Sequence, residues 1–259
     1  MPNPSTLIFP FFKYVGIESA MKIILNSSLK FNTPDQFNDP FDINPVYPKE
    51  GFYELLKSKT ITDAHGNPIE YDPEAIYAAM HTQNSREQSC RHIAVTCFSK
   101  SAQIGPMWAH YADNHKGCVL EFEFTEDDQS QIDKHVLEYK YSVNPDLLDP
   151  QPVEYPIDNE RPVAYGNNGQ VTGFGRKVLF TKPYQWHYEQ EVRCIRRDPA
   201  GFYPFPRHQL KRVIFGLKTP EDEKRAIRAL IEVVTKEHGA WIDVAQIEME
   251  HGTYNLLIK

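Results

Sequence analysis

Two glutamates separated by one residue are the clearest chemical signal in this chain. Glu189 and Glu191 lie in the segment 188–193, directly before an apolar run that ends at Ile195. That run predicts a strand, and residues i and i+2 of a strand share a face, so both carboxylates are expected to point the same way. Two like charges at this spacing raise one pKa, which suits proton abstraction or stabilisation of a developing cation. An exposed strand whose solvated glutamates pair with Arg193 is the alternative.

The charge around this pair differs from that of the rest of the chain. The net charge of the 259 residues is -7, yet residues 173–236 hold 14 Lys and Arg against 7 Asp and Glu, which leaves +7 there and -14 elsewhere. A carboxylate pair in a basic segment indicates an anionic ligand such as a dinucleotide, a phosphate or a nucleic acid. Ordinary solvated surface charge explains the same composition and stays open.

The order of patterns predicts one α+β domain over residues 1–259. Apolar runs rich in aromatic and β-branched residues predict strands at 9–15, 29–33, 93–98, 118–124, 135–141, 213–217, 242–249 and 254–258. Helices are expected from Ser19, over 52–58 and 73–89, from Pro106 to about residue 114, and from Thr219 to Gly239. Residues 44–91 are interpreted as a helical insertion and residues 144–175 as a long loop region.

Composition limits the class of protein. The chain is 41% hydrophobic and 12% aromatic, enough for a buried core, and no apolar stretch approaches the length needed to cross a bilayer. The four cysteines form no C-x-x-C pair, which favours a reduced, cytoplasmic protein with no membrane partner. His110 and His115 are five residues apart, so no zinc helix and no metal site is expected. Hydrolase, P-loop and dinucleotide glycine motifs are absent from the sequence.

Polar side chains at the ends of two predicted strands are further candidates. Lys13 and Tyr14 end the first strand, where they offer a phosphate contact and a stacking face. A lysine that reaches solvent beside a core tyrosine is the alternative. Ser99 and Ser101 follow the strand at 93–98, where a hydroxyl either bonds a ligand or caps the next helix.

An ordered loop and an aromatic helix complete the set of candidates. Residues 34–42 place turn formers between Phe37 and Phe41, as expected of a loop pinned into the core at both ends. Loops of this make-up often hold function. Helical spacing puts Trp108 and Tyr111 on one stripe, and such a stripe belongs to a core more often than to a site.

Seven short motifs follow one another at specific spacings. They are Phe12-Lys13-Tyr14, Leu29-Lys30-Phe31, Phe37-Asn38-Asp39-Pro40-Phe41-Asp42, Thr96-Cys97-Phe98-Ser99, Trp108-Ala109-His110-Tyr111-Ala112, His115-Lys116-Gly117 and Tyr188-Glu189-Gln190-Glu191-Val192-Arg193. Together they resemble a widespread bacterial family catalogued as domain of unknown function 2971, over nearly the whole chain. The family name implies no activity.

A more distant resemblance lies in the order of four elements. A strand ending in Lys13, a helix, a strand at 29–33 and the segment 97–101 leading into the Tyr111 helix are similar to the ADP-ribosyltransferases. Those enzymes bind NAD in a cleft between two small sheets and cleave its bond to nicotinamide. The resemblance implies an ADP-ribosyltransferase-like split β-sandwich, two small sheets around a central cleft, with helical insertions. It places Glu191 as the catalytic glutamate and Glu189 in a Glu-x-Glu element.

The resemblance also implies roles for individual residues. Glu191 is expected to hold the ribose hydroxyls and stabilise the ribosyl oxocarbenium ion, and Glu189 to orient or deprotonate the acceptor. The implied NAD-binding residues are Lys13, Tyr14, Asn32, Thr33, Asn38, Asp39, Phe98, Ser99, Ser101, Trp108, Tyr111 and Arg193.

The leading hypothesis is therefore an NAD-consuming ADP-ribosyltransferase-like enzyme. By family analogy it acts as an anti-phage defence or toxin effector on nucleic acid or protein, with an antitoxin or defence-system partner. A non-catalytic module that binds a nucleotide or nucleic acid through the basic segment and aromatic side chains is one alternative. A metal-dependent nuclease is another, and it requires Asp39, Asp42, Glu189 and Glu191 to converge in space.

Overall fold

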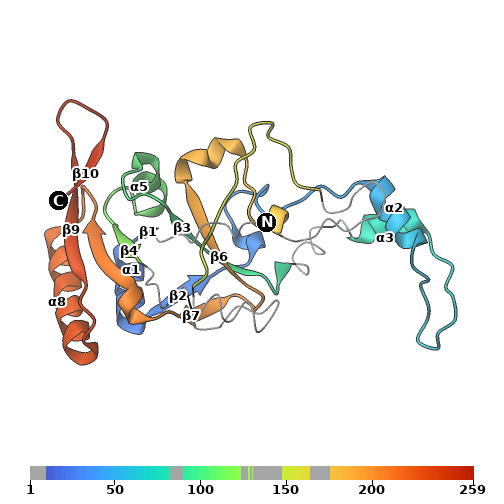
Figure 1. The fold of residues 1–259 in the computed structure, drawn as a ribbon, viewed down its shortest axis with the longest axis horizontal. Coiled ribbons are helices and arrows are strands. Elements are labelled where there is room, and N and C mark those ends of the chain that lie inside the picture. Colours follow the sequence, from blue (N-terminus) through green and yellow to red (C-terminus); the bar gives the residue numbers. More distant parts are fainter. Residues whose placement is uncertain are drawn as a thin grey trace.

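The apolar runs of the sequence become the strands of one large sheet in the computed structural model. The structure describes residues 10–80, 90–123, 148–163 and 176–259, together with residues 82, 128 and 130. The described strands form an eight-stranded mixed sheet and a separate two-stranded sheet, with helices packed around them (Figure 1). This arrangement confirms the expected α+β class.

The strands of the large sheet are, in spatial order, β10 (Leu256–Ile258), β9 (Asp243–Met249), β8 (Leu210–Phe215), β4 (Cys118–Phe122), β1 (Phe11–Val15), β3 (Ala94–Ser99), β6 (Glu191–Arg196) and β5 (Gln151–Pro152). Neighbours are antiparallel except β8 and β9, which are parallel. The small sheet pairs β2 (Ser28–Phe31) with β7 (Gly201–Pro204).

The large sheet is weakly joined at its centre. β1 and β3 share a single register pair, Phe12 with Ser99, whereas β3 and β6 align over six residues and β1 and β4 over five. A strand pair held at one point is free to diverge beyond it, because no further ladder of hydrogen bonds fixes the spacing. Within this continuous sheet, the junction between β1 and β3 therefore has the shortest register.

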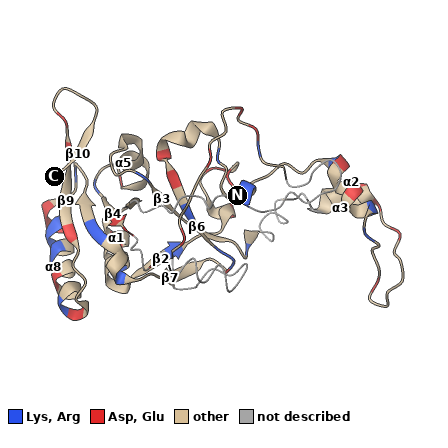
Figure 2. Cartoon of the chain, in the orientation of Figure 1, with Lys and Arg blue, Asp and Glu red and all other residues tan. Residues whose placement is uncertain are grey.

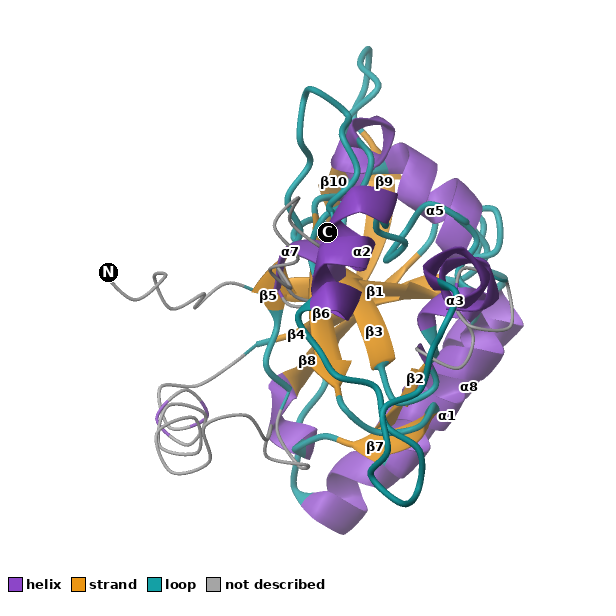
Figure 3. Ribbon diagram, turned by 90° about the vertical axis from the view of Figure 1, so that its right-hand side faces the viewer, coloured by secondary structure: helices purple, strands orange, loops and turns teal. Residues whose placement is uncertain are grey.

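Helices cover the part of the sheet that contains β1. α1 (Ile17–Asn26) lies beside α8 (Glu221–His238), as Figure 3 shows. Ile227, Ile231 and Val234 of α8 are buried, and Gly239 ends this helix with a φ of 70°, as its sequence pattern predicts. The predicted start of α1 was wrong: the helix begins before Ser19, after an N-cap residue that makes no side-chain bond.

The remaining helices include those of the insertion. α2 (Lys49–Lys57) and α3 (Pro73–Met80) extend away from the sheets (Figure 1), and the interpretation of 44–91 as a helical insertion stays a prediction. The shorter elements are α5 (Gly105–Tyr111), α7 (Arg176–Leu179), η1 (Pro34–Gln36), η2 (Tyr184–Glu189) and η3 (Arg207–Gln209). The second half of the helix expected at 73–89, the strand expected at 135–141 and much of the loop at 144–175 lie outside the described residues. No helix of the described part has the length and apolar character needed to span a bilayer.

Two apolar clusters fix the position of β1. Phe11 and Val15 belong to the cluster that includes residues of α1 and α8, while Phe12 and Tyr14 belong to a second cluster around Trp108. Alternate residues of a strand face opposite sides, so each cluster takes one face of β1. The two clusters therefore hold β1 from both faces, whereas its edge toward β3 is paired at one position only.

Candidate active site

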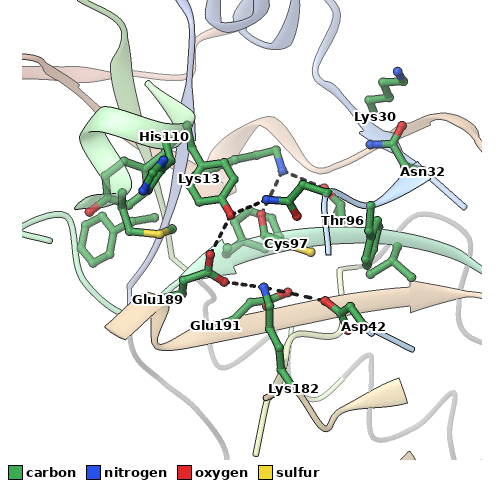
Figure 4. A pocket seen from close by; sticks show the side chains of 18 of the residues that line it. Lys13, Lys30, Asn32, Asp42, Thr96, Cys97, His110, Lys182, Glu189 and Glu191 are labelled. Carbon is green, nitrogen blue, oxygen red and sulfur yellow. Dashed lines mark hydrogen bonds and ion pairs between the residues drawn. The ribbon is translucent and has the colours of Figure 1, made fainter. Parts of the chain in front are cut away.

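A cavity of about 440 Å³ lies where β1 and β3 diverge. Its walls come from β1, β3, α5 and the loop at 34–42, together with Lys30 of β2, Asn32, Lys182, the end of η2 and the start of β6 (Figure 4). Of the residues expected to bind NAD, those that line it are Lys13, Tyr14, Asn32, Asn38, Phe98 and Tyr111, and both Glu189 and Glu191 line it as well. The separate motifs of the sequence therefore meet at one place.

Lys13 bridges the gap between the two strands. Its Nζ donates hydrogen bonds to Thr96 Oγ1 and to the Cys97 carbonyl oxygen, each at 2.9 Å, and lies 5.1 Å from the centre of the Phe98 ring. Burial lowers the pKa of this amine. All of these partners are neutral, so within the described part of the chain Lys13 faces the cavity without an ion pair.

The backbone around the glutamates differs from the predicted strand. Glu189 is the last residue of η2, Gln190 adopts the left-handed conformation with φ 46° and ψ 47°, and β6 begins only at Glu191. The expectation that both carboxylates share one strand face was therefore wrong. The turn at Gln190 nevertheless brings them together, at exposures of 2% and 3%, so the solvated alternative was also wrong.

Lys182 lies between the carboxylates and joins them. Its Nζ is 2.5 Å from Glu189 Oε2, 3.0 Å from Glu191 Oε2 and 3.7 Å from Asp42 Oδ2. Burial lowers the pKa of Lys182, but the charges of Glu191, Glu189 and Asp42 raise that pKa by more than burial lowers it. The net shift of the pKa is therefore upward. Lys182 is therefore an ammonium that holds three converging carboxylates.

Arg193 also binds carboxylates of this group. Its side chain is fully buried, and its Nε donates to Glu191 Oε1 at 2.7 Å while one Nη donates to Asp42 Oδ2 at 2.6 Å. The other Nη donates to the Leu179 carbonyl oxygen at 2.9 Å. With its donors engaged in this way and no part of it lining the cavity, Arg193 is placed to position Glu191 rather than to hold a ligand phosphate.

The two glutamates differ in proton affinity. Burial raises the pKa of Glu191, but the charges of Arg193 and Lys182 lower it more strongly, to about 2. Burial also raises the pKa of Glu189, and the single charge of Lys182 does not reverse that shift. Glu191 is therefore ionised at all ordinary pH values, and Glu189 is the member of the pair that can exchange a proton.

Tyr111 connects this pair to the loop at 34–42. Its hydroxyl donates to Glu189 Oε1 at 2.7 Å and accepts a hydrogen bond from Asn38 Nδ2 at 3.2 Å. Figure 4 shows Glu189, Glu191, Lys182 and Asp42 in one connected row along the cavity. The row combines Glu191, which stays ionised, with Glu189, a hydrogen-bonded carboxylate that can exchange a proton.

The two serines of the predicted site bond to backbone groups with their hydroxyls. Ser99 is fully buried and its hydroxyl donates to the Glu189 carbonyl oxygen at 2.7 Å, which fixes the turn before β6. The Ser101 hydroxyl accepts from the backbone N–H of Gln103 at 3.1 Å. Neither serine lines the cavity, and neither caps α5, whose N-cap is Ile104.

Three other predicted ligand residues also lie outside the cavity wall. Trp108 is completely buried, so the core interpretation of the aromatic stripe is confirmed for this residue, while Tyr111 lines the cavity. Asp39 is buried and its Oδ1 accepts from the backbone N–H of Phe41 at 2.9 Å. Thr33 is the N-cap of η1 and makes no side-chain cap bond. These residues shape the loop and the core behind the site.

We expect Trp108→Phe to lower the free energy of unfolding by about 1–3 kcal/mol. The indole Nε1 donates to the Ala102 carbonyl oxygen at 2.7 Å, so the change leaves a buried acceptor without its donor and removes core volume. Urea denaturation measures the difference, and an unfolding midpoint equal to that of the wild type would contradict the core position of this ring.

Sequence reasoning missed residues that contribute to the cavity. Lys182 stood only as one of many basic residues, seven positions before Glu189, and no motif marked it. Thr96 and Cys97 stood in a recognised motif without an assigned role, and His110 was considered only as a metal ligand. These residues lie close to the motifs in the sequence, but this closeness identifies a site only once it is known which strands pair.

The basic segment does not surround the glutamates as a continuous anion-binding surface. Lys182 and Arg193 do contact the pair, but Arg207 donates to the carbonyl oxygens of residues 24 and 25. Arg212 pairs with Glu121 at 3.3 Å on the far part of the sheet. Figure 2 shows further basic residues on α8. Arg207 and Arg212 of the basic segment therefore make contacts within the fold, away from the glutamates.

The carboxylate group does not have the form of a metal site. Asp42, Glu189 and Glu191 converge, but on the ammonium of Lys182, and Asp39 points to the backbone of its own loop. Among the described residues no group of three or more His, Cys, Asp or Glu side chains could hold a metal ion. All four cysteines are free thiols. This geometry disfavours the metal-dependent nuclease.

The comparisons with known proteins bear on part of the chain. No curated protein and no solved structure matches it. The residues that do match a family model are 107–194, and this segment contains Tyr111, Lys182, both glutamates of the site and Arg193. The model is that of the family described as "Protein of unknown function (DUF2971)", so the expected resemblance to this family is confirmed over residues 107–194.

Proposed function

We propose that this protein is an NAD-consuming, ADP-ribosyltransferase-like enzyme. The observation that carries the proposal is the pair of unlike glutamates on one cavity: Glu191 is held ionised by Arg193 and Lys182, and Glu189 has a raised pKa. A fixed anion stabilises a cation that develops in the reaction, and a carboxylate of raised pKa accepts a proton from an attacking group.

The reaction proceeds in two parts in this proposal. The bond between the ribose carbon and the nicotinamide nitrogen breaks, nicotinamide leaves with the electron pair, and Glu191 stabilises the ribosyl oxocarbenium ion. An acceptor hydroxyl or amine then forms the new bond to the ribose carbon and passes its proton to Glu189. The hydroxyl of Tyr111, 2.7 Å from Glu189 Oε1, keeps that carboxylate oriented toward the cavity.

The walls of the cavity suit NAD as the substrate. Tyr14, Phe98 and Tyr111 offer aromatic surface for the nicotinamide ring, and Lys13 is a cation without an ion pair in the described part of the chain, suited to the pyrophosphate. The single register pair between β1 and β3 supports the finer proposal of a split β-sandwich, with the two parts of the sheet around the cleft. The NAD-consuming effector would modify nucleic acid or protein in a defence or toxin system, by family analogy.

The proposal is tested by incubating the purified chain with NAD and candidate acceptors. Release of nicotinamide, followed by chromatography, reports cleavage, and a label on the adenosine portion reports transfer to single-stranded nucleic acid or to protein. We expect release above the rate of NAD alone. A folded, NAD-saturated protein that releases none in the presence of both acceptor classes would contradict the proposed function.

We expect the rate of ADP-ribosyl transfer to fall as the solution becomes acidic. Burial raises the pKa of Glu189 above its ordinary value, so its proton-accepting form is lost as pH falls through that raised pKa, while Glu191 stays ionised. The groups that face Glu189 are Lys182, Tyr111, Tyr188 and Glu191. The profile of kcat/KM against pH measures this acidic limb, the fall in kcat/KM toward low pH, and Glu189→Gln should remove the limb. A limb that persists in Glu189→Gln would assign it to another group.

A non-catalytic binding module is the second candidate. The observation in its favour is that Glu191 already has two cationic partners, Arg193 at 2.7 Å and Lys182 at 3.0 Å, as a purely structural carboxylate does. Tight binding of NAD or ADP-ribose without release of nicotinamide would favour this function over catalysis.

A further inference from the structure

The small sheet of β2 and β7 has one face packed against the core and one face turned outward. Leu29 and Phe31 of β2 are buried, at exposed fractions of 0% and 1%. Successive residues of a strand point to opposite sides, so the alternate positions face away from the core. They include Lys30 of β2, which is exposed, and Phe202 of β7, which is 67% exposed. The outward face thus carries a cation and an aromatic ring.

Lys30 and Phe202 are direct neighbours on this outward face. They are cross-strand partners in the antiparallel pair of β2 and β7, so their side chains lie on the same side with Cβ atoms about 4.5–5.5 Å apart. Lys30 also lines the cavity that contains Glu189 and Glu191. Figure 4 shows Lys30 next to Asn32, apart from the two glutamates. The outward face of the small sheet therefore continues from the cavity wall.

The charge of this face suits a polyanion. Within the described ranges Lys30 forms no ion pair, and β2 and β7 contain no acidic residue. The turn that joins β6 to β7 adds Arg197, which is exposed, and the acidic residue of this turn, Asp198, is paired with Arg196 at 3.2 Å. A chain of phosphates that crosses this face therefore meets cations and no uncompensated carboxylate of these elements.

The exposed ring of Phe202 suits a nucleobase better than a protein surface. Every base has a π-face that stacks on an aromatic side chain. In the small sheet the exposed apolar residues are Phe202 and Pro204, a small patch, whereas a specific protein–protein interface buries about 1,000 Å² or more. Stacking on a side chain also requires a base that is not held in a duplex. The face therefore favours a single strand of nucleic acid.

We propose that the outward face of the β2–β7 sheet binds single-stranded nucleic acid, with a base stacked on Phe202 and a phosphate at Lys30. The strand is the acceptor of the transfer, a role that rests on the proposed function. It runs from this face into the cavity and brings the next nucleotide toward Glu189. There an amine or hydroxyl of the nucleotide forms the new bond to the ribose carbon and passes its proton to Glu189, while nicotinamide leaves with the electron pair of the broken bond.

Fluorescence anisotropy on the full chain, without NAD, tests this surface. The probes are a short fluorescein-labelled DNA strand of mixed sequence, the RNA strand of the same sequence, and the DNA annealed to its complement. We expect a single strand to bind several-fold more tightly than the duplex, and the comparison of DNA with RNA identifies the preferred sugar. Phe202→Ala should weaken single-strand binding on the order of tenfold. Lys30→Gln should lower the slope of log Kd against log salt by about 0.7.

The matched controls are exposed residues of the same kind elsewhere on the molecule. Tyr254 lies in the turn between β9 and β10, which Figure 1 shows apart from the small sheet, and Lys259 follows β10. Tyr254→Ala and Lys259→Gln should leave the affinity and the salt slope unchanged. Because Phe202 and Lys30 are exposed, their variants should fold as the wild type does, which circular dichroism checks.

The outcomes separate this inference from the proposed function. A wild type that binds neither single strand, or binds the duplex equally well, overturns the inference even if a variant fails to fold. Nicotinamide release would then still support the transferase, with protein as acceptor. Equal losses in Phe202→Ala and Tyr254→Ala also overturn it, as does a Phe202→Ala variant that raises the KM for NAD and leaves strand binding intact. Strand binding that depends on Phe202 and Lys30, without nicotinamide release, upholds the surface in a binding module and contradicts the transferase.

Discussion

Glu191→Gln is expected to lower the rate of nicotinamide release about 10²- to 10³-fold, with little change in the KM for NAD. The carboxylate is ionised because Arg193 and Lys182 hold its pKa at about 2 despite burial, and its charge acts on the substrate only when the ribose becomes cationic. The amide keeps the shape of the side chain and loses that charge. Initial rates at several NAD concentrations separate the two kinetic parameters.

A matched variant shows whether the loss is specific to the site. Glu121, on β4, is also a strand glutamate with little exposure and an arginine partner, Arg212 at 3.3 Å, but it does not line the cavity. Glu121→Gln should retain the wild-type rate. Equal losses in Glu121→Gln and Glu191→Gln would assign the effect to general destabilisation, and circular dichroism with thermal melting checks that both variants are folded.

Arg193→Met is expected to lower the free energy of unfolding by about 3–5 kcal/mol. The guanidinium is fully buried and donates to Glu191, Asp42 and the Leu179 carbonyl oxygen. Methionine fills much of the space but removes the charge, so buried carboxylates lose a principal cation. The midpoint and slope of guanidinium denaturation measure the loss.

The control for this prediction is another arginine of the same sheet. Arg212 on β8 is 38% exposed at its side chain and pairs with Glu121. Because solvent screens such a pair, Arg212→Met should cost less than about 1 kcal/mol. If the two methionine variants were equally stable, the buried ion pairs of Arg193 would not hold the site together.

Local patterns predicted the elements well. The helix that ends at Gly239 and the strands around the Cys97 and Cys118 segments follow from apolar periodicity and glycine punctuation, which act within a few residues. The left-handed Gln190 is different, because no glycine marks it. A strand was therefore predicted two residues too early, although the conclusion that both carboxylates converge was right.

Long-range pairing explains what the sequence could not reveal. Lys182 contacts Asp42, 140 positions earlier in the chain by their residue numbers, and that meeting depends on how β1, β3 and β6 assemble. Serine hydroxyls and a tryptophan near a candidate site also look the same in sequence whether they face a ligand or a backbone carbonyl. Ser99 and Trp108 turned inward because buried carbonyl oxygens require donors.

The role of Glu191 is tested most directly by a single-turnover experiment with protein in excess of NAD. This design detects cleavage even when the preferred acceptor is missing, since water accepts the ribosyl cation slowly. We expect the wild type to release nicotinamide, and Glu191→Gln, folded and at the same concentration, to release little above the rate of NAD alone. Equal release by the two proteins, or none from a wild type shown to bind NAD, would contradict the assignment of Glu191 as the catalytic carboxylate.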